Sequence, residues 1–424
     1  MLPKTSNDST DNDDRDNVLV IYANSLGLLI KHGFRVEALD PTIVAKMWTL
    51  DTQDNVLMAD DNVDTRKLRP DKLASVLTTR LRIHNELARL LGEEESREGA
   101  EAGARRRPVN IVRNTKIQSV DVNAGRVTAV DGREFAGDVI VGADGINSMV
   151  RAAIQEAASA PASLPQHTGM VTYLGDLSAE QYAQVFPLHL AQDNTGPVAI
   201  QQLRPTMNSR RPIDATNDFR RMWTFAYDCD RRVQLSAVAP DAKWLSRMSK
   251  RTILSNVDAR EVAEDFADFG ESTQKLIQMC PRWDVWLLRD LDPLSTWTFG
   301  KAVVIGDAAH AIQPHVGQGC NQAIESAEVL GHFLHRVARE DVSRSLSSFV
   351  RLRQPRAQIY QIASRHFGGS LRPEEEAILG QPMDLDFETY LQLTADWNGA
   401  EAAVKAGKVQ IMPRHYEQFV KLAK

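Results

Sequence analysis

The chain has few cysteines, few aromatic residues and no excess of positive charge. Its 424 residues include 3 Cys, at positions 229, 280 and 320, and 6% Phe, Trp and Tyr. Three scattered thiols form neither a disulfide framework nor a zinc site, so we expect no metal centre. The 50 Lys and Arg against 56 Asp and Glu give a net charge of −6. Nucleic acid is therefore not expected as a partner, because phosphate contacts need a basic surface.

The sequence also lacks the segments that send a protein to a membrane. No run of about 20 apolar residues is free of charge, so no membrane span is expected. Residues 1–17 are rich in Asp and lack the basic and apolar regions of a secretory signal, which predicts a disordered acidic tail. Together with the few cysteines, these absences predict a cytoplasmic protein.

The remaining sequence has enough apolar material, 43% of its residues, for two or three domains. Val18–Tyr22 and Lys301–Ile305 are apolar runs suited to buried strands, and helical periodicity follows each of them. Between these α/β parts lie strand-like runs such as Met170–Tyr173 and Arg221–Tyr227. The predicted fold class is α/β, mixed with α+β, with a Rossmann-like three-layer domain interrupted by a sheet domain. The expected order is a tail over 1–17, the first part of the layered domain over 18–160 with a flexible insertion at 93–107, the sheet domain over 161–295, the return segment over 296–370 and a helical extension over 371–424.

A first ligand-binding pattern lies in Asp138–Arg151, where a strand leads through Gly142-Ala143-Asp144-Gly145 into a helix. The two glycines let a ligand approach the backbone, Asp144 can accept hydrogen bonds, and the helix N-terminus offers free N–H groups. An ordinary Asp-Gly turn between strand and helix has the same pattern.

A second and more specific pattern runs from Val303 to Leu330. A strand ends at Gly306-Asp307, and the loop Gly317-Gln318-Gly319 leads into another helix. Asp307 is placed to accept a hydrogen bond from a sugar or ribityl hydroxyl, and the N–H groups of the first helical residues can bind phosphate. Those helical residues are Gly319, Cys320 and Asn321.

These two segments resemble the DG and GD motifs of single-component FAD-dependent monooxygenases of the salicylate-hydroxylase and para-hydroxybenzoate-hydroxylase type. The resemblance implies FAD as cofactor, NAD(P)H as cosubstrate, and a substrate-binding role for the sheet domain. It places Pro314 and Gly317 beside the flavin ring. Residues 80–90 are expected to form an amphipathic helix with Leu81, His84, Leu87 and Leu90 on one face. Arg80 with Ile83, His84 and Leu87 resembles a family helix in which the arginine contacts FAD. The implied cofactor-binding set is Arg80, Asp144, Gly145, Gly306, Asp307, Pro314, Gly317, Gly319, Cys320 and Asn321.

The chain departs from this family at two places. After Val18–Tyr22 there is no GxGxxG turn, and residues 21–26 resemble a stretch that in the family follows the first βαβ unit, so we expect an N-terminally incomplete FAD-binding domain. A competing alignment makes Val18–Tyr22 the first strand and Arg35–Leu39 the second, but about a dozen residues are too few for a crossover helix. The second departure is Tyr173-Leu174-Gly175, where relatives often have Tyr-Arg-Gly.

The expected function is hydroxylation of an aromatic or polycyclic small molecule with NAD(P)H and O₂, in secondary metabolism. The alternative is a flavin-poor or inactive member of the same fold. No catalytic residue stands out: His310 and Cys320 are interpreted as packing residues, and His315 as a residue that lines the loop.

Overall fold

The computed structural model describes residues 17–44, 46–60, 73–96, 109–186, 199–203, 219–248, 251–372, 375, 390 and 394–405. The expected tail, apart from Asn17, and most of the expected insertion lie outside these residues. Helix α3 (Arg80–Ser96) reaches into the start of that insertion. No helix in the described ranges combines the length and the apolar character needed to cross a membrane.

The largest sheet has eight strands in the order β14-β15-β10-β13-β12-β11-β3-β4. Their bounds are β3 (Met47–Leu50), β4 (Val56–Asp60), β10 (Gln166–Ser178), β11 (Ala199–Leu203), β12 (Arg221–Tyr227), β13 (Arg232–Pro240), β14 (Ile253–Val257) and β15 (Trp283–Asp290). The sequence predicts the strands in the middle of the chain, since their β-branched and aromatic residues suit a pleated, half-buried surface. Its domain boundaries do not anticipate β3 and β4, which join this sheet because β3 pairs in parallel with β11.

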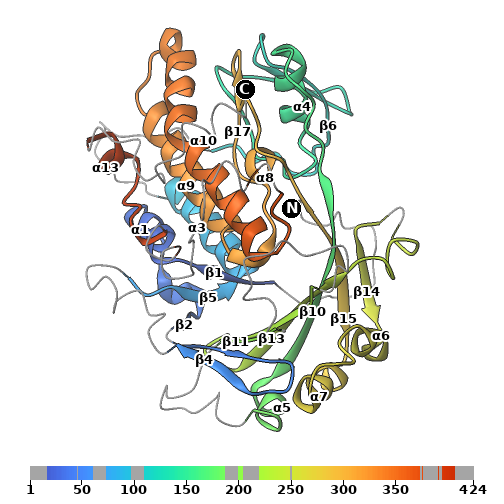
Figure 1. Ribbon diagram of the computed structural model, residues 1–424. Helices are drawn as coiled ribbons and strands as arrows, with labels where there is room; N and C mark the ends of the chain where they lie inside the picture. The colour runs from blue at the N-terminus through green and yellow to red at the C-terminus, as the bar shows by residue number, and fades with distance from the viewer. Residues whose placement is uncertain are drawn as a thin grey trace.

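The two faces of this sheet have different neighbours. Helices α6 (Ala259–Asp265) and α7 (Glu271–Met279) cover one face (Figure 1), where Tyr173, Trp244 and Trp283 belong to one buried apolar cluster. The short helix α5 (Ala179–Ala183) begins at the end of β10. The opposite face carries a smaller cluster of Met170, Phe219, Val238 and Leu288, with Trp223 packed against it.

A second layer is built from two distant parts of the chain. The parallel strands β9 and β17 lie in a three-stranded sheet with β16, and a separate meander of β6, β7 and β8 precedes β9. The strands are β6 (Ile117–Asp121), β7 (Arg126–Ala129), β8 (Glu134–Ala136), β9 (Ile140–Gly142), β16 (Thr298–Phe299) and β17 (Ala302–Val304). The helices are α4 (Met149–Ala157), α8 (Asp307–His310), η4 (Pro314–Val316), α9 (Gly319–Leu334), η5 (Arg339–Asp341), α10 (Val342–Phe367) and α13 (Ala400–Lys405). In this layer the chain returns to an α/β arrangement.

The N-terminal part forms a small sheet that packs against α9. Strand β1 pairs antiparallel with β5, which also pairs antiparallel with β2. The elements are β1 (Val18–Ile21), α1 (Ala23–Lys31), η1 (Val36–Leu39), β2 (Thr42–Ile43) and β5 (Val76–Thr79). The competing alignment is wrong, because residues 36–39 form a 3-10 helix and β1 has no parallel partner among the described strands.

Helix α3 exists as the sequence predicts, but with another buried face. Leu81 and Leu87 are 54% and 41% exposed, whereas Ile83 and Glu86 are buried. The Glu86 carboxylate accepts hydrogen bonds from Arg89 and Arg35, which hold its pKa well below the usual range. One of the two arginines that pair with the buried Glu86 carboxylate, Arg35, lies outside the helix, so helical periodicity alone cannot reveal this buried face.

Candidate functional site

Two turns with aspartate lie at the same edge of the β9/β17 sheet. Val304 of β17 is opposite Gly142 of β9, and the Ile305 N–H donates to the Gly142 carbonyl at 2.9 Å. Parallel strands end at one edge, so the turns that contain Asp144 and Asp307 become neighbours. Arg151 joins them, because its guanidinium donates to the Ala308 carbonyl at 3.1 Å. The structure thus brings together the two motifs that the sequence singles out.

The Asp144 carboxylate is occupied by its own helix. It accepts hydrogen bonds from the Ser148 hydroxyl at 2.5 Å, from the Met149 N–H at 2.8 Å and from the Val150 N–H at 3.3 Å. Asp144 therefore satisfies N–H groups at the start of α4 that would otherwise lack partners. Gly145 has φ of 79°, a conformation that favours glycine.

Asp307 differs, since no donor among the described residues binds its carboxylate. The backbone turns sharply before it, with φ of 59° at Gly306. The Asp307 side chain keeps solvent-accessible surface, yet the surrounding protein removes enough water to raise the pKa of its carboxyl. The carboxylate can accept a hydrogen bond from a ligand hydroxyl.

The start of α9 offers a second set of unused groups. No side chain caps this helix, and the N–H groups of Gly319, Cys320 and Asn321 have no acceptor in the described structure. A Cβ at Gly319 would meet no atom closer than 4.0 Å, so the space beside this helix end is open. Uncapped N–H groups next to open space suit a phosphate.

The side chains near this helix end have structural roles. The Asn321 amide donates to the Val20 carbonyl at 2.8 Å and accepts from the Tyr22 N–H at 2.9 Å, which ties β1 to α9. Burial, with Asp307 nearby, raises the pKa of the Cys320 thiol to about 12, so it is not a nucleophile at neutral pH. Gly317 is left-handed at φ of 62°, and a Cβ there would lie 2.5 Å from the Val20 side chain.

The loop between α8 and α9 is held from several directions. The Ser364 hydroxyl donates to the Gln313 carbonyl at 2.7 Å. The Val316 carbonyl accepts from the hydroxyls of Tyr390 at 2.8 Å and Tyr22 at 3.2 Å. Pro314 starts the one-turn helix η4 between these two anchors. The backbone beside the expected flavin ring is therefore fixed in advance, a feature that favours binding and catalysis.

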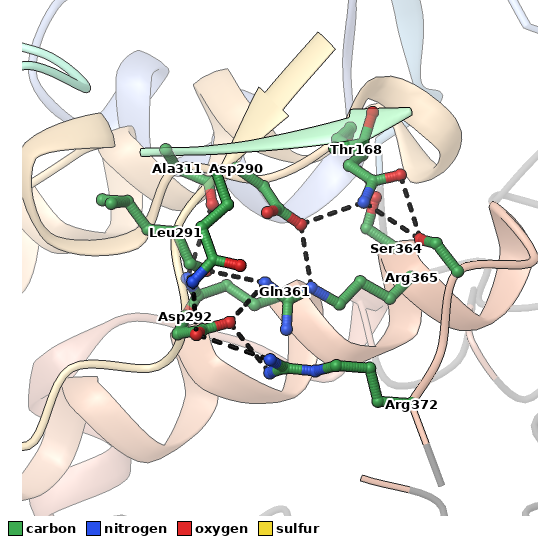
Figure 2. A network of polar contacts seen from close by, with 12 residues as sticks. Thr168, Asp290, Leu291, Asp292, Ala311, Gln361, Ser364, Arg365 and Arg372 are labelled. Atoms are coloured by element: carbon green, nitrogen blue, oxygen red, sulfur yellow. Dashed lines mark hydrogen bonds and ion pairs between the residues drawn. The ribbon is translucent and has the colours of Figure 1, made fainter. Parts of the chain in front are cut away.

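A network of charged residues contacts the loop between α8 and α9 through Gln313. Figure 2 shows Arg365 of α10 reaching Asp290 at the end of β15, while Arg372 reaches Asp292. Arg365 also pairs with Glu375, and these carboxylates raise its pKa even though burial opposes this. Asp290 in turn accepts from the Gln313 amide at 2.9 Å. The network thus connects β15, α10 and the loop.

His310 and Arg80, two further residues singled out in the sequence, lie in different surroundings. His310 is 1% exposed, stacks on Trp297 and contacts the Ser326 hydroxyl at 2.9 Å, as its interpretation as a packing residue predicts. Arg80 has an exposed side chain at the start of α3, and its backbone N–H donates to Asn17. Its contact with FAD stays a prediction.

The sequence reasoning misses Tyr22, Tyr390 and Arg221. The two tyrosines have no local signal, since their common contact is a carbonyl distant in sequence from both. Arg221 has a weak signal. It shares the alternating face of its strand with Trp223 and Phe225, where an apolar residue is the usual choice.

These residues fit FAD at two points. The unpartnered Asp307 carboxylate suits a ribityl hydroxyl, and the free N–H groups of α9 suit a pyrophosphate. A third point, a glycine-rich turn between a parallel strand and a helix near the start of the domain, is not present among the described residues.

Comparison with known proteins agrees with this geometry. Residues 278–362 match the family described as FAD binding domain. A salicylate hydroxylase from Pseudomonas putida is 25% identical over 307 residues, which span 69% of this chain and 67% of that protein. A 6-methylsalicylate 1-monooxygenase from Aspergillus terreus is 30% identical over 245 residues, 55% of this chain and 48% of that protein.

A solved salicylate hydroxylase substrate complex has a TM-score of 0.67 to this chain at 20% identity, covering 93% of this chain and 91% of the other. Residues 278–362 therefore match an FAD binding domain, and the chain has the mixed α/β fold of these hydroxylases, as the sequence predicts. The aligned part spans about two thirds of the bacterial relative and about half of the fungal one.

Proposed function

We propose that this relative of the FAD-dependent aromatic hydroxylases is itself an FAD-dependent monooxygenase, which hydroxylates an aromatic small molecule with NAD(P)H and O₂. Three findings support the proposal: the FAD binding domain match, the hydroxylase relatives, and the unpartnered acceptor and donor groups around α9. A cytoplasmic location is part of the proposal, and it rests on the low cysteine content.

The groups that would hold FAD lie after the end of β17 and at the start of α9. Asp307 would accept from the ribityl chain, and the N–H groups of Gly319, Cys320 and Asn321 would bind the pyrophosphate. Gly306 allows the sharp turn that exposes Asp307. When bound, the flavin accepts hydride from NAD(P)H and activates O₂ for transfer to an aromatic carbon.

The chain itself would orient the substrate and exclude water. The loop over 311–317 is held by Tyr22, Tyr390 and Ser364, so its N–H groups keep their direction without reorganisation. The face of the large sheet opposite α6 and α7 presents aromatic residues toward this loop, among them Phe219, whose ring lies 5.6 Å from the His315 ring. An aromatic substrate between loop and sheet would be shielded from solvent on both sides.

The desolvated, unpartnered Asp307 carboxylate is the observation that carries the proposal. The test is to titrate the purified 424-residue chain with FAD, following flavin fluorescence, and then to assay NAD(P)H oxidation and hydroxylated product with a panel of aromatic acids. Arg80→Ala is expected to weaken FAD retention if the predicted contact is correct. FAD binding without substrate-stimulated NAD(P)H oxidation would instead favour the inactive alternative.

The absence of a GxGxxG turn sets the expected affinity. Backbone hydrogen bonds to a charged pyrophosphate contribute about 1.5–3 kcal/mol each, so the lack of even three shifts a nanomolar site to micromolar or weaker. We therefore expect the 424-residue chain to be flavin-poor after purification. Fusing a glycine-rich strand-turn-helix unit before Val18 is expected to tighten FAD binding, and stoichiometric FAD without that unit would contradict this reasoning.

A further inference from the structure

Arg353 of α10 is a buried cation that shares its acidic partner with a second arginine. It is 0% exposed, and its Nη2 atom lies 3.6 Å from the Glu325 carboxylate. Arg356 donates two shorter hydrogen bonds to the same carboxylate, at 2.7 and 2.9 Å. Burial lowers the pKa of Arg353 to about 10, although Glu325 opposes this. An apolar residue of similar volume is often as stable at such a position, so stability alone does not explain the charge.

The Arg353 guanidinium contacts the first turns of α9. Its Nη2 atom donates to the Gln322 carbonyl at 2.8 Å and to the Gln322 side-chain oxygen at 2.6 Å. Its Nε atom donates to the Ser326 hydroxyl at 3.1 Å. A guanidinium has donors and no acceptor, so the oxygen of the Gln322 amide must face it and the NH₂ group must face away. Arg353 therefore fixes the orientation of the Gln322 amide.

Gln322 in turn fixes the amide of Gln318, the residue that precedes α9. The Gln322 Nε2 atom donates to the Gln318 side-chain oxygen at 2.9 Å, and the Gln322 N–H donates to the Gln318 carbonyl at 2.8 Å. Both side chains are fully buried. The NH₂ group of Gln318 is therefore on the opposite side of its amide, where its nitrogen has no acceptor within hydrogen-bond distance in the described structure. The relay from Arg353 through Gln322 to Gln318 thus has a single direction.

The relay ends beside Tyr390, which holds the loop over 311–317. Burial raises the pKa of Tyr390 well above its usual value, and the nearby Gln318 side chain opposes this. The Tyr390 hydroxyl donates to the Val316 carbonyl at 2.8 Å. An NH₂ group cannot accept that hydrogen, so the observed Gln318 orientation leaves the bond to Val316 undisturbed. A reversed Gln318 amide would present its oxygen instead, which would compete with Val316 for the Tyr390 hydrogen.

Gln318 also connects the two parts of the proposed cofactor site. It lies between Gly317, which ends the loop, and Gly319, which begins α9 with its free N–H groups. A change in the Gln318 side chain therefore reaches both the loop and the helix start, although Arg353 itself belongs to another helix.

We propose that Arg353 is a positioning residue for FAD: acting through Gln322, it fixes the direction of the Gln318 amide and so holds the loop over 311–317 and the start of α9 in the geometry that binds the cofactor. The inference rests on the proposed function and deepens it. Arg353 and Gln322 act as one unit, because the loss of either leaves the Gln318 amide free to turn over.

The main test is a double-mutant cycle in FAD affinity. The dissociation constant of FAD is determined by fluorescence titration for the full chain and for Arg353→Met, Gln322→Met and the double variant. Each single variant is expected to weaken FAD binding about 3- to 10-fold, the effect of one hydrogen bond. The double variant should lose no more than either single variant, whereas independent residues would give about 10- to 100-fold.

These variants are expected to fold. Arg353→Met leaves the Glu325 carboxylate with Arg356 and with the Asn24 amide, which donates to it at 2.5 Å. Gln322→Met keeps every ion pair, so it tests the relay even if Arg353→Met does not fold. Thermal unfolding of each flavin-free variant establishes that the titrated protein is native.

The matched control is Gln358→Met, which removes another buried glutamine. Gln358 lies on α10 and donates to the Leu294 carbonyl at 2.9 Å, outside the relay. It is expected to lower the unfolding temperature and to leave the FAD affinity within about 2-fold of wild type, a difference below that of one typical hydrogen bond. A loss of affinity as large as that of Gln322→Met would attribute the effect to general loosening and overturn the proposal.

Arg353→Lys separates positioning from charge. Lysine is also a cation with donors and no acceptor, so it can still face the Gln322 oxygen and should restore most of the affinity lost in Arg353→Met. If the charge alone acted on FAD, Gln322→Met would bind FAD like wild type. That result would overturn the relay.

The wild-type titration separates this inference from the proposed function. FAD binding by wild type that neither Arg353→Met nor Gln322→Met weakens would overturn the positioning role and leave the proposed function intact. Separate losses that multiply in the double variant would also overturn it, because the two residues would then act independently. No FAD binding by wild type at millimolar FAD would remove the proposed function and this inference together.

Discussion

Asp144 and Asp307 follow two adjacent parallel strands at one sheet edge, yet they differ in their partners. Three donors of its own helix bind the Asp144 carboxylate, whereas no described donor binds the Asp307 carboxylate. Both occur in a Gly-rich turn that resembles a ligand motif. The difference shows that a motif becomes a candidate site only where the fold leaves its polar atoms unsatisfied.

Two buried arginines repeat this difference around the loop over 311–317. Arg365 is paired with Asp290 and Asp292 (Figure 2) and also with Glu375. Arg221 has no acidic partner in the described structure. The paired cation holds three carboxylates together, whereas the unpaired one keeps a buried donor, Nε, without an acceptor.

The largest effect is expected from Arg365→Met. Removing this guanidinium leaves Asp290 and Glu375 buried with reduced compensation, which typically costs about 3–5 kcal/mol of folding stability. Equilibrium denaturation with urea measures the loss, with Arg221→Met as the matched variant that should lose little. Similar losses in the two variants would break the distinction between paired and unpaired cations.

The next effect concerns ligand affinity. Asp307→Ala removes an acceptor that we assign to a ribityl hydroxyl, so FAD binding should weaken by about 1–3 kcal/mol, with the free energy of unfolding of the flavin-free chain nearly unchanged. Fluorescence titration with FAD measures the affinity. Unchanged FAD affinity in a folded variant would exclude Asp307 from the site.

Local patterns of the sequence predict much of the fold and part of the site. The strand from Arg221 to Tyr227 and the strand-turn-helix units at Gly145 and Gly306 follow from periodicity and turn residues that act over short distances. The two aspartates meet for a general reason, since parallel strands end at one edge.

The rest depends on contacts between distant residues. No short-range pattern indicates that β3 pairs with β11. Nor does one indicate that Glu86, which accepts from Arg35, is buried while Leu81 is exposed. The surroundings of Arg221 cannot be predicted for the same reason. A sequence shows that this arginine exists, but not that no carboxylate among the described residues pairs with it.

A third prediction uses the buried histidine of the Asp307 segment. Burial, with Arg353 nearby, lowers the pKa of His310 to about 3. Above about pH 6.5 the imidazole is neutral in both the folded and the unfolded chain. As the pH falls below about 6.5, the unfolded chain binds a proton at His310, whereas the folded chain does so only near pH 3. The free energy of unfolding therefore decreases as the pH falls. Between pH 7 and 5 this contributes about 2 kcal/mol at about 1.4 kcal/mol per pH unit.

The check is urea denaturation of wild type and His310→Gln at pH 7 and pH 5. The variant should lose about 2 kcal/mol less than wild type over this interval, because glutamine does not titrate. The same acid sensitivity in both proteins would show that His310 is protonated in the folded state.

The smallest effect is expected at Asp144. Asp144→Ala removes the acceptor of the Met149 and Val150 N–H groups at the start of α4, so we expect a loss of about 1 kcal/mol in stability, in the range typical of helix caps. Ser148→Ala removes the neighbouring cap, which accepts from the Arg151 N–H at 2.9 Å, and should behave alike. FAD affinity should change less in both variants than in Asp307→Ala, because the Asp144 oxygens are already engaged. The reverse pattern, intact stability with FAD binding weakened as strongly as in Asp307→Ala, would mean that satisfied polar atoms do not mark scaffold at this edge, and that both aspartates bind the cofactor.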